Sequence, residues 1–178
     1  MFFPEGSVGR LLRKKYWRWR FRTGAKPEVQ FGARIYGEGF VEIGDNFLLG
    51  FYSEVNAGTD GIGRIFIGND VAIARGCMIV SVNHRYDSVD VPIRYQGHVA
   101  KCLKYGGASY GIIIEDDVWI GANVVVVTGT HIGTGSVIGA NSLVTGFIPP
   151  FSIVMGNPGR VVKSRLKTAC TRDAGSGG

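Results

Sequence analysis

The segment "IEDDVWIGANVVVVTGTHIGTGSVIGANSLVTGFIP", residues 114–149, repeats with a period of six residues. An aliphatic residue begins each sextet, at Ile114, Ile120, Val126, Ile132, Ile138 and Val144. After a slip of four residues, the register resumes at Ile148 and Val154. The same spacing occurs earlier, at Val29, Ile35 and Val41, then Ile43, Leu49 and Val55, and then Ile67, Ile73 and Ile79. The repeat therefore runs through most of the chain.

A period of six fits neither an α-helix, with 3.6 residues per turn, nor an amphipathic strand, with a period of two. It fits a solenoid in which the chain turns a corner every six residues and three short walls close a triangular coil. The first residue of each sextet then points inward, and small residues ease the corners. An ordinary β-sandwich with coincidental spacing is the alternative, and the number of matches in three separate blocks disfavours it.

Charge is distributed unevenly along the 178 residues, whose net charge is +6. Eight basic residues and no acidic residue lie between Arg10 and Lys26, and five more basic residues lie between Arg160 and Arg172. The segment 27–159 has seven basic and twelve acidic residues, a net charge of −5. An acidic body with basic ends argues against a general nucleic-acid-binding surface.

Cysteine usage and hydropathy indicate the compartment. Cys77, Cys102 and Cys170 are an odd number at irregular spacing, without a C-x-x-C pair, which argues against a secreted disulfide scaffold and a zinc knuckle. The sequence contains neither an apolar core of signal-peptide length near its start nor an apolar run of about 18 residues. We therefore expect a cytoplasmic protein.

The segment 114–163 resembles the hexapeptide-repeat acyltransferases, in particular galactoside and maltose O-acetyltransferases and those that modify bacterial surface polysaccharides. The motifs that carry the resemblance are "DVWIG" at 117–121, "IGA" at 138–140 and "GNP" at 156–158. The resemblance covers about residues 29–163 and implies an all-β, left-handed parallel β-helix. The left hand comes from the resemblance, because the general crossover rule favours right-handed connections.

The expected organisation has three parts. A basic, aromatic N-terminal arm or cap helix occupies residues 1–28, and the β-helix domain occupies 29–163, with a loop at about 84–111. Residues 164–178 form a basic and then disordered tail, in which Arg165 and Lys167 extend the basic run.

The segment "CMIVSVNHRYD", residues 77–87, matches the place where the family carries a catalytic histidine, which makes His84 the expected general base. A sugar hydroxyl is a poor nucleophile until its proton is removed, and an ordinary imidazole, with a pKa of about 6.5, can accept that proton near neutral pH. The hydroxyl oxygen then attacks the thioester of acetyl-CoA directly, without a Ser or Cys nucleophile. His98 lies in the expected loop, and lining the acceptor pocket is an alternative role for it. We expect His131 to be a corner residue.

The resemblance also implies where acetyl-CoA binds. The matching positions are Trp119, Gly121, Ala122, Ala140 and Thr145 for the thioester and pantetheine arm, and Arg160 and Lys163 for the phosphates. The oxyanion donor falls at Gly121 and Ala122, where a backbone N–H must serve because Ala122 replaces the serine of some members. Gly146 follows Thr145, at a position where the family usually has a lysine. Asn83, Asn56 and Asp60 are the candidate acceptor-binding residues, and no metal is expected.

The expected function is acetyl-CoA-dependent O-acetylation of a sugar or glycan, in surface polysaccharide or lipopolysaccharide biosynthesis. The family implies a homotrimer with active sites between subunits. Serine, an amino sugar or a xenobiotic remain alternative acceptors. A γ-type carbonic anhydrase, which needs three convergent histidines, and a non-catalytic solenoid subunit are the competing classes.

The stretch "SVGRLLRKKYWRWRFR", residues 7–22, places Val8, Leu11, Leu12, Tyr16 and Trp19 on one helical stripe among seven cations. Two interpretations stay open. The segment is a cap helix or arm that covers the open end of the solenoid, whose strand edges need protection, or it makes a peripheral contact with anionic lipid at the inner face of the membrane.

Overall fold

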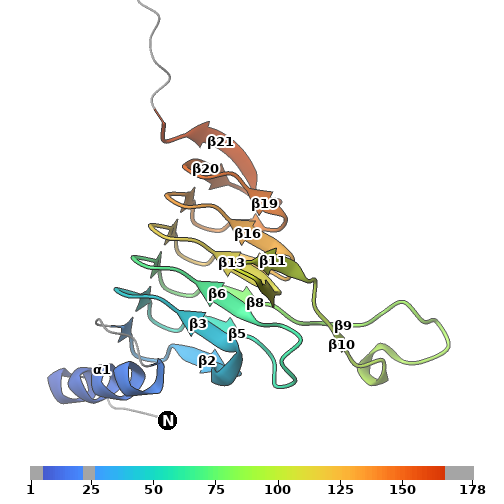
Figure 1. The fold of residues 1–178 in the computed structure, drawn as a ribbon, viewed down its shortest axis with the longest axis horizontal. Helices are drawn as coiled ribbons and strands as arrows, with labels where there is room; N and C mark the ends of the chain where they lie inside the picture. Colours follow the sequence, from blue (N-terminus) through green and yellow to red (C-terminus); the bar gives the residue numbers. More distant parts are fainter. Residues whose placement is uncertain (1–5, 22–26, 167–178) are drawn as a thin grey trace, which may run out of the picture.

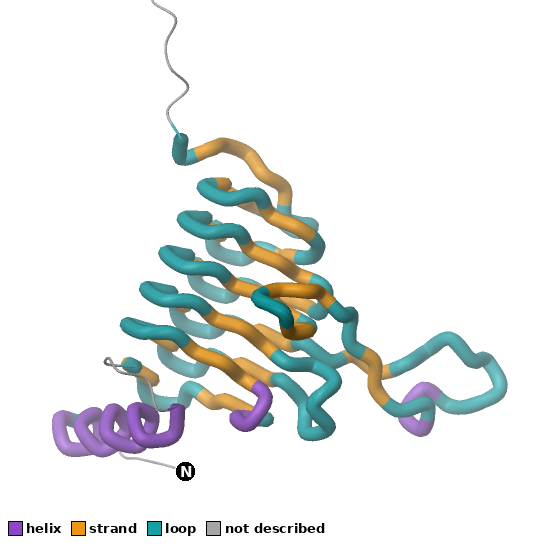
Figure 2. The backbone as a smooth tube through the Cα atoms, in the orientation of Figure 1, coloured by secondary structure: helices purple, strands orange, loops and turns teal. Residues whose placement is uncertain are grey.

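The computed structural model describes residues 6–21 and 27–166, which wind into a tapering stack of triangular coils (Figure 1). The fold is the predicted left-handed parallel β-helix, which confirms the expected fold class. Five complete coils are followed by the first wall of a sixth, and each coil contributes one short strand to each of three parallel sheets (Figure 2). We call these sheets walls A, B and C, in the order in which the chain visits them.

The strands of each wall pair in parallel and in register. Wall A contains β1 (Glu28–Val29), β4 (Leu48–Leu49), β7 (Ala72–Ile73), β14 (Trp119–Ile120), β17 (Val137–Ile138) and β20 (Ser152–Met155), followed by the antiparallel β21 (Arg160–Ser164). Wall B contains β2 (Arg34–Tyr36), β5 (Glu54–Asn56), β8 (Met78–Val80), β15 (Val125–Val127) and β18 (Leu143–Val144). Wall C contains β3 (Val41–Ile43), β6 (Ile65–Ile67), β13 (Ile112–Ile114), β16 (Thr130–Ile132) and β19 (Phe147–Ile148).

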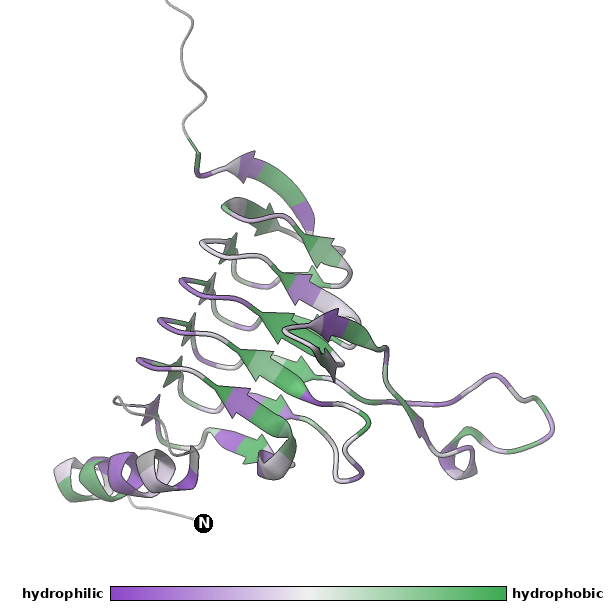
Figure 3. Ribbon diagram, in the orientation of Figure 1, coloured by the Kyte–Doolittle hydropathy of each residue, from purple (hydrophilic) through white to green (hydrophobic). Residues whose placement is uncertain are grey.

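The six-residue period determines the core. Every aliphatic residue that the period places inside is buried, except Ile43, which is partly buried. In wall A, for example, Ile120 pairs in register with Ile73 on one side and Ile138 on the other. Equivalent side chains of neighbouring coils therefore stack in columns, about 4.8 Å apart. Figure 3 shows the apolar residues recurring on the strands of successive coils.

The corners need small residues because adjacent coils pack closely there. A Cβ atom on Gly121 would lie 2.8 Å from the backbone nitrogen of Ala140 and 2.9 Å from the carbonyl oxygen of Ile138. Gly121 therefore has a structural reason to be glycine, whatever else it does. Asn123 and Asn141, one coil apart, adopt left-handed backbone conformations with φ of 56° and 60°, which asparagine tolerates better than most residues.

His131 is not a corner residue, so that expectation was wrong. It lies in the middle of β16, on the outer face of wall C, where its Nε2 is 2.7 Å from Oε1 of Glu115. The Tyr105 and Phe147 rings contact the imidazole edge to face, with centroids 5.8 and 5.2 Å away. His131 is position six of its sextet and directly precedes the inward Ile132. Because β16 includes both residues, position six belongs to the wall and not to the corner.

Two segments leave the repeat between walls B and C. Residues 57–64 form a loop in the second coil, and residues 81–111 form a much longer excursion in the third. The excursion contains β9 (Asn83–His84), the 3-10 helix η2 (Ile93–Tyr95), β10 (His98–Val99), and the hairpin of β11 (Leu103–Tyr105) and β12 (Ala108–Tyr110). The hairpin lies against wall C through rings of Tyr105 and Tyr110 on Phe66.

The helix α1 (Ser7–Phe21) covers the first coil, near the short 3-10 helix η1 (Glu38–Phe40) (Figure 1). Trp17, 8% exposed, joins the core cluster that contains Val29, and Tyr16 packs against it. Arg20 forms an ion pair of 3.7 Å with Glu38. The predicted disordered end of the tail, including Lys167, lies outside the described residues.

Replacing Ile120 with alanine is expected to lower the free energy of unfolding by about 2–5 kcal/mol, because the side chain is fully buried in the middle of its column. Urea denaturation at one protein concentration measures the effect. Ile62→Ala is the matched control, since this isoleucine is exposed on the loop of the second coil. Equal stability losses in the two variants would contradict the inward assignment of the repeat.

Candidate active site

His84 lies on an arm, residues 81–102, that projects from the corner between walls B and C (Figure 1). β9 and β10 pair antiparallel, with His84 opposite His98 and Asn83 opposite Val99. The two imidazole rings have centroids 4.8 Å apart and planes at 44°. All four residues are exposed. The predicted base and the second histidine of the loop are therefore direct neighbours at an accessible surface.

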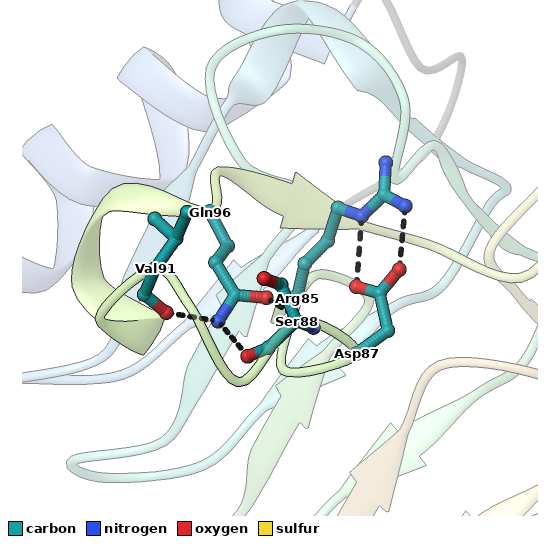
Figure 4. Close-up of polar contacts among 5 residues, drawn as sticks. All are labelled: Arg85, Asp87, Ser88, Val91 and Gln96. Carbon is teal, nitrogen blue, oxygen red and sulfur yellow. Dashed lines mark hydrogen bonds and ion pairs between the residues drawn. The ribbon is translucent and has the colours of Figure 1, made fainter.

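Polar contacts within the arm hold the chain between its two strands (Figure 4). The side-chain amide of Gln96 donates to the carbonyl oxygens of Ser88, at 2.9 Å, and Val91, at 2.6 Å, and it accepts from the Ser88 N–H. Arg85 makes two bonds to the Asp87 carboxylate, at 3.2 and 2.9 Å. The hydrogen bonds from Arg85 lower the pKa of Asp87, so this exposed ion pair persists at neutral pH. The arm is a defined structure and carries His84 on a paired strand.

The three histidines lie in two places. His84 and His98 share the arm, whereas His131 is on wall C, bonded to Glu115 and covered by the β11–β12 hairpin. Within residues 6–21 and 27–166, no group of three His, Cys, Asp or Glu residues is placed to hold a metal ion. A single chain thus does not show the convergent histidines that the carbonic anhydrase alternative requires.

Trp119 lies on the outer face of wall A, where its side chain is 55% exposed. Strand pairing continues its column through Val137 and Ile153 to Lys163 of β21. Directly paired residues lie on the same face of a sheet, so Lys163 lies on the outer face three strands from Trp119, about 14 Å away. Arg160 pairs with Met155 at the neighbouring outward position. Wall A therefore presents an aromatic side chain at one level and cations at another.

The corner between walls A and B carries Gly121 and Ala122 in one coil and Ala140 in the next. The N–H of Gly121 donates to the carbonyl oxygen of Ile138, at 2.8 Å, and is therefore occupied within the ladder. The N–H of Ala122 makes no hydrogen bond within the described part of the chain. Of the two positions predicted to supply an oxyanion donor, only Ala122 has a donor that can reach a ligand.

The predicted site residues fall into two groups on opposite sides of the prism. His84, Asn83 and Thr145 belong to the corner between walls B and C, and Trp119, Gly121, Ala122, Ala140, Arg160 and Lys163 belong to wall A or its corner with wall B. In a three-sided coil, wall A lies opposite the B/C corner. Apart from Thr145, therefore, one chain does not bring the predicted acetyl-CoA residues to the corner of the predicted base.

The other two predicted acceptor residues lie one coil below the arm, Asn56 at the end of β5 and Asp60 in the loop of residues 57–64. The Asn56 amide donates to Glu54, at 3.1 Å, and its oxygen accepts from the Gly58 N–H, at 3.0 Å. The Asp60 carboxylate accepts from the Ile62 N–H, at 3.3 Å. Both side chains shape the loop itself. They share the corner of His84, but the structure places only Asn83 on the same strand as the base.

Comparisons with known proteins agree with this geometry. Residues 111–146 match the model "Bacterial transferase hexapeptide (six repeats)". The galactoside O-acetyltransferase of Escherichia coli strain K12 is 32% identical to the chain over 164 residues, which cover 89% of this chain and 81% of that protein. The chain belongs to the hexapeptide-repeat acyltransferases. The prediction from the sequence motifs is thereby confirmed, and so is the enzyme class at the level of the family.

Other hexapeptide-repeat proteins extend the comparison. A protein named "Probable acetyltransferase" from Mycobacterium tuberculosis is 38% identical over 128 residues, but the match covers only 38% of that protein and 72% of this chain. The crystal structure of a maltose O-acetyltransferase from Clostridium difficile 630 matches with a TM-score of 0.64 and 28% identity, over 87% of this chain and 75% of that one. Solved structures with the same fold, at 20% and 24% identity, include complexes with coenzyme A and acetyl coenzyme A.

Two features of this hexapeptide-repeat chain escaped prediction. The pairing of His84 with His98 depends on the register of two exposed strands, β9 and β10. In the sequence, the only clue is that short segments suited to strands lie on both sides of residues 85–97. The His131–Glu115 pair could have been found from the period, because Glu115 directly follows β13, the strand that pairs with the strand of His131 in the next coil.

Proposed function

We propose that the protein is an acetyl-CoA-dependent O-acetyltransferase that acts on a sugar hydroxyl. The observation that carries the proposal is an accessible imidazole, His84, held on a paired strand outside a hexapeptide-repeat prism. Membership of the family supplies the reaction class, and relatives named galactoside and maltose O-acetyltransferases support a sugar acceptor.

In the proposed mechanism, His84 takes the proton of the acceptor hydroxyl as the oxygen bonds to the thioester carbonyl carbon. The resulting oxyanion accepts a hydrogen bond from the N–H of Ala122, the donor that the ladder leaves available. Collapse of the tetrahedral intermediate breaks the carbon–sulfur bond, and the imidazolium returns its proton to the departing thiolate of coenzyme A. The products are the acetyl ester and the free thiol, so His84 ends in its starting state.

The proposed enzyme is a homotrimer with its active sites between subunits. The separation of the two residue groups supports this, because His84 of one subunit needs wall A of another to complete a site. An interface that joins two different surfaces is heterologous, and such interfaces close into rings. The number three is the number that the family resemblance implies.

Wall A holds the donor in this proposal. The pantetheine arm runs from the Trp119 and Ala122 level, where the thioester meets the base, towards the level of Lys163 and Arg160, which bind the phosphates. Thr145, from the corner of His84, contacts the donor from the opposite side.

Replacing Lys163 with glutamine is expected to raise KM for acetyl-CoA by roughly threefold to thirtyfold, the range of a hydrogen bond to a charged group that solvent partly screens. The value of kcat is expected to change little, because the cation acts far from the reacting atoms. Acetyl-pantetheine, which lacks the nucleotide phosphates, is the discriminating donor, and its KM should be the same in both proteins. Lys104→Gln, on the β11–β12 hairpin, is the matched control. Equal increases of KM with both donors would contradict a phosphate contact.

The acceptor that we propose is a glycan of the cell surface, in polysaccharide or lipopolysaccharide biosynthesis. In this proposal Asn83, which lies beside the base, contacts the glycan. Asn56 and Asp60 contribute through the shape of the neighbouring loop. The expected cytoplasmic localisation stays a prediction. Among the described residues, no helix is both long and apolar enough to cross a bilayer.

The proposed function is tested with the purified full chain, radiolabelled acetyl-CoA and separate panels of acceptors. Galactosides, maltose and bacterial glycans test the sugar hydroxyl, and serine, an amino sugar and chloramphenicol test the alternatives. The proposal expects label in an alkali-labile ester of a sugar. Label in an amide, or transfer to serine or chloramphenicol in preference to every sugar, would overturn the proposed acceptor class. Absence of transfer to all of them would overturn the activity.

A further inference from the structure

Helix α1 turns an apolar stripe towards solvent. Val8, Leu11, Lys15 and Trp19, together with Leu12, follow the spacing of one helical face. Val8, Leu11 and Trp19 are 67%, 66% and 74% exposed. The helix packs on the first coil through other positions, which include Trp17 and Tyr16. None of these stripe side chains belongs to the buried core cluster, although Leu11 also lines a hollow between α1 and the first coil.

The helix covers the first coil, as the cap-helix interpretation expects, but it does so through residues outside the exposed stripe. The covering residue is Trp17, which the predicted stripe did not include, and Tyr16 turns towards the core although it was assigned to the stripe. The helix therefore contacts the core of the prism through Trp17 and Tyr16, while Trp19 stays exposed. Figure 3 shows hydrophobic and hydrophilic residues side by side on α1.

Cations border the stripe on the same helix. Arg10, Lys14 and Lys15 are exposed, and the described helix contains no acidic residue. Arg10, Arg13 and Lys14 also line a hollow of about 350 Å³ between α1 and the first coil, whose other walls include Glu28, Phe31 and Phe51. Phe51 is itself 43% exposed. Apolar and cationic surface thus lie together at the end of the prism opposite β21 (Figure 1).

We propose that α1 is an interfacial helix that docks the protein on a bilayer containing anionic phospholipid. Leu11, Leu12 and Trp19 enter the boundary between headgroups and acyl chains, where an indole ring is favourably placed. The cations beside them meet the lipid phosphates, and Lys15 extends its ammonium from the stripe to the headgroups. The helix lies in the plane of the surface and holds the prism above it. The docking surface is separate from the proposed active site.

The test is co-sedimentation of the full chain with vesicles of phosphatidylcholine alone and of equal parts phosphatidylcholine and phosphatidylglycerol. We expect at least about tenfold tighter binding to the anionic vesicles, weakened by salt. The stripe variant Leu11→Ser/Trp19→Ser should lose about tenfold or more, because two apolar side chains no longer leave water. Lys14→Gln should lose about fivefold, the effect of one cation near the surface.

The matched control is Val89→Ser/Tyr95→Ser, which removes two equally exposed apolar side chains from the arm and should bind like the wild type. In addition, anionic vesicles should shift the fluorescence of the full chain to shorter wavelength, and Trp19→Phe should abolish the shift while binding persists. Equal binding by the wild type and the stripe variant, or no binding by the wild type, would overturn the proposal. A lower oligomeric mass of the stripe variant in solution would overturn it too, by assigning the stripe to a contact between copies. None of these readouts involves acetyl transfer, so they are independent of the proposed activity.

Discussion

Replacing His84 with alanine is expected to lower kcat for acetyl transfer by roughly 10²- to 10⁴-fold, the usual contribution of a general base. The KM for acetyl-CoA should change little, since in the proposed site the donor binds on wall A. The physical reason is that an undissociated hydroxyl attacks a thioester poorly, and the exposed imidazole on β9 is the group placed to remove its proton. Initial rates with a saturating sugar acceptor measure the effect.

His131→Gln provides the control, because it removes the same kind of side chain from wall C, where the imidazole is bonded to Glu115. The acetyl-transfer activity of this variant should stay near that of the wild type. Its free energy of unfolding should be lower, because the bond to Glu115 is lost. A His84→Ala enzyme that keeps more than about a tenth of the wild-type rate would remove His84 from the role of base. Circular dichroism of both variants would show whether the coils persist.

The inward positions of the prism could be predicted because one physical rule governs all of them. A strand that turns a corner every six residues buries the same position of each sextet, and so the aliphatic spacing that includes Ile120 and Val126 indicates the column in which each residue lies. The rule fails at the margins. Ile43 is only partly buried, and the prediction for His131 failed because β16 begins at Thr130, two residues before the inward Ile132.

The site could be predicted less completely, because its parts do not follow the period. The arm of residues 81–102 is mostly exposed, so no apolar pattern specifies the register that sets His98 opposite His84. That register depends on the polar contacts of Gln96. Motif matching assigned Gly121 and Ala122 one shared role, and only the hydrogen bonds of the ladder separate them. At α1, the helical spacing of Leu11 and Trp19 was read correctly, but amphipathicity alone does not say which face meets the solenoid.

The second large effect concerns the division of each site between subunits. Ala140→Glu places a bulky, charged side chain at the A/B corner, on an exposed position next to Gly121. It is expected to block the proposed acetyl-CoA site and to leave the proposed trimer nearly inactive, as His84→Ala is expected to do. The two defects lie at different corners of the prism, A/B for Ala140 and B/C for His84. In a mixed trimer, therefore, the Ala140→Glu chain can supply the intact corner with His84, and the His84→Ala chain can supply the intact surface for acetyl-CoA.

Mixed trimers test the central claim, that the coiled prism sets the imidazole of one chain against wall A of another. His84→Ala and Ala140→Glu chains with different affinity tags are co-expressed, and trimers that carry both tags are isolated in two steps. Each such ring contains one site with both intact parts, whichever chain is present twice, so activity should rise to about one third of the wild-type value. His84→Ala chains that carry both tags are the control and should stay inactive. Mixed trimers no more active than either variant alone would contradict a site shared between chains.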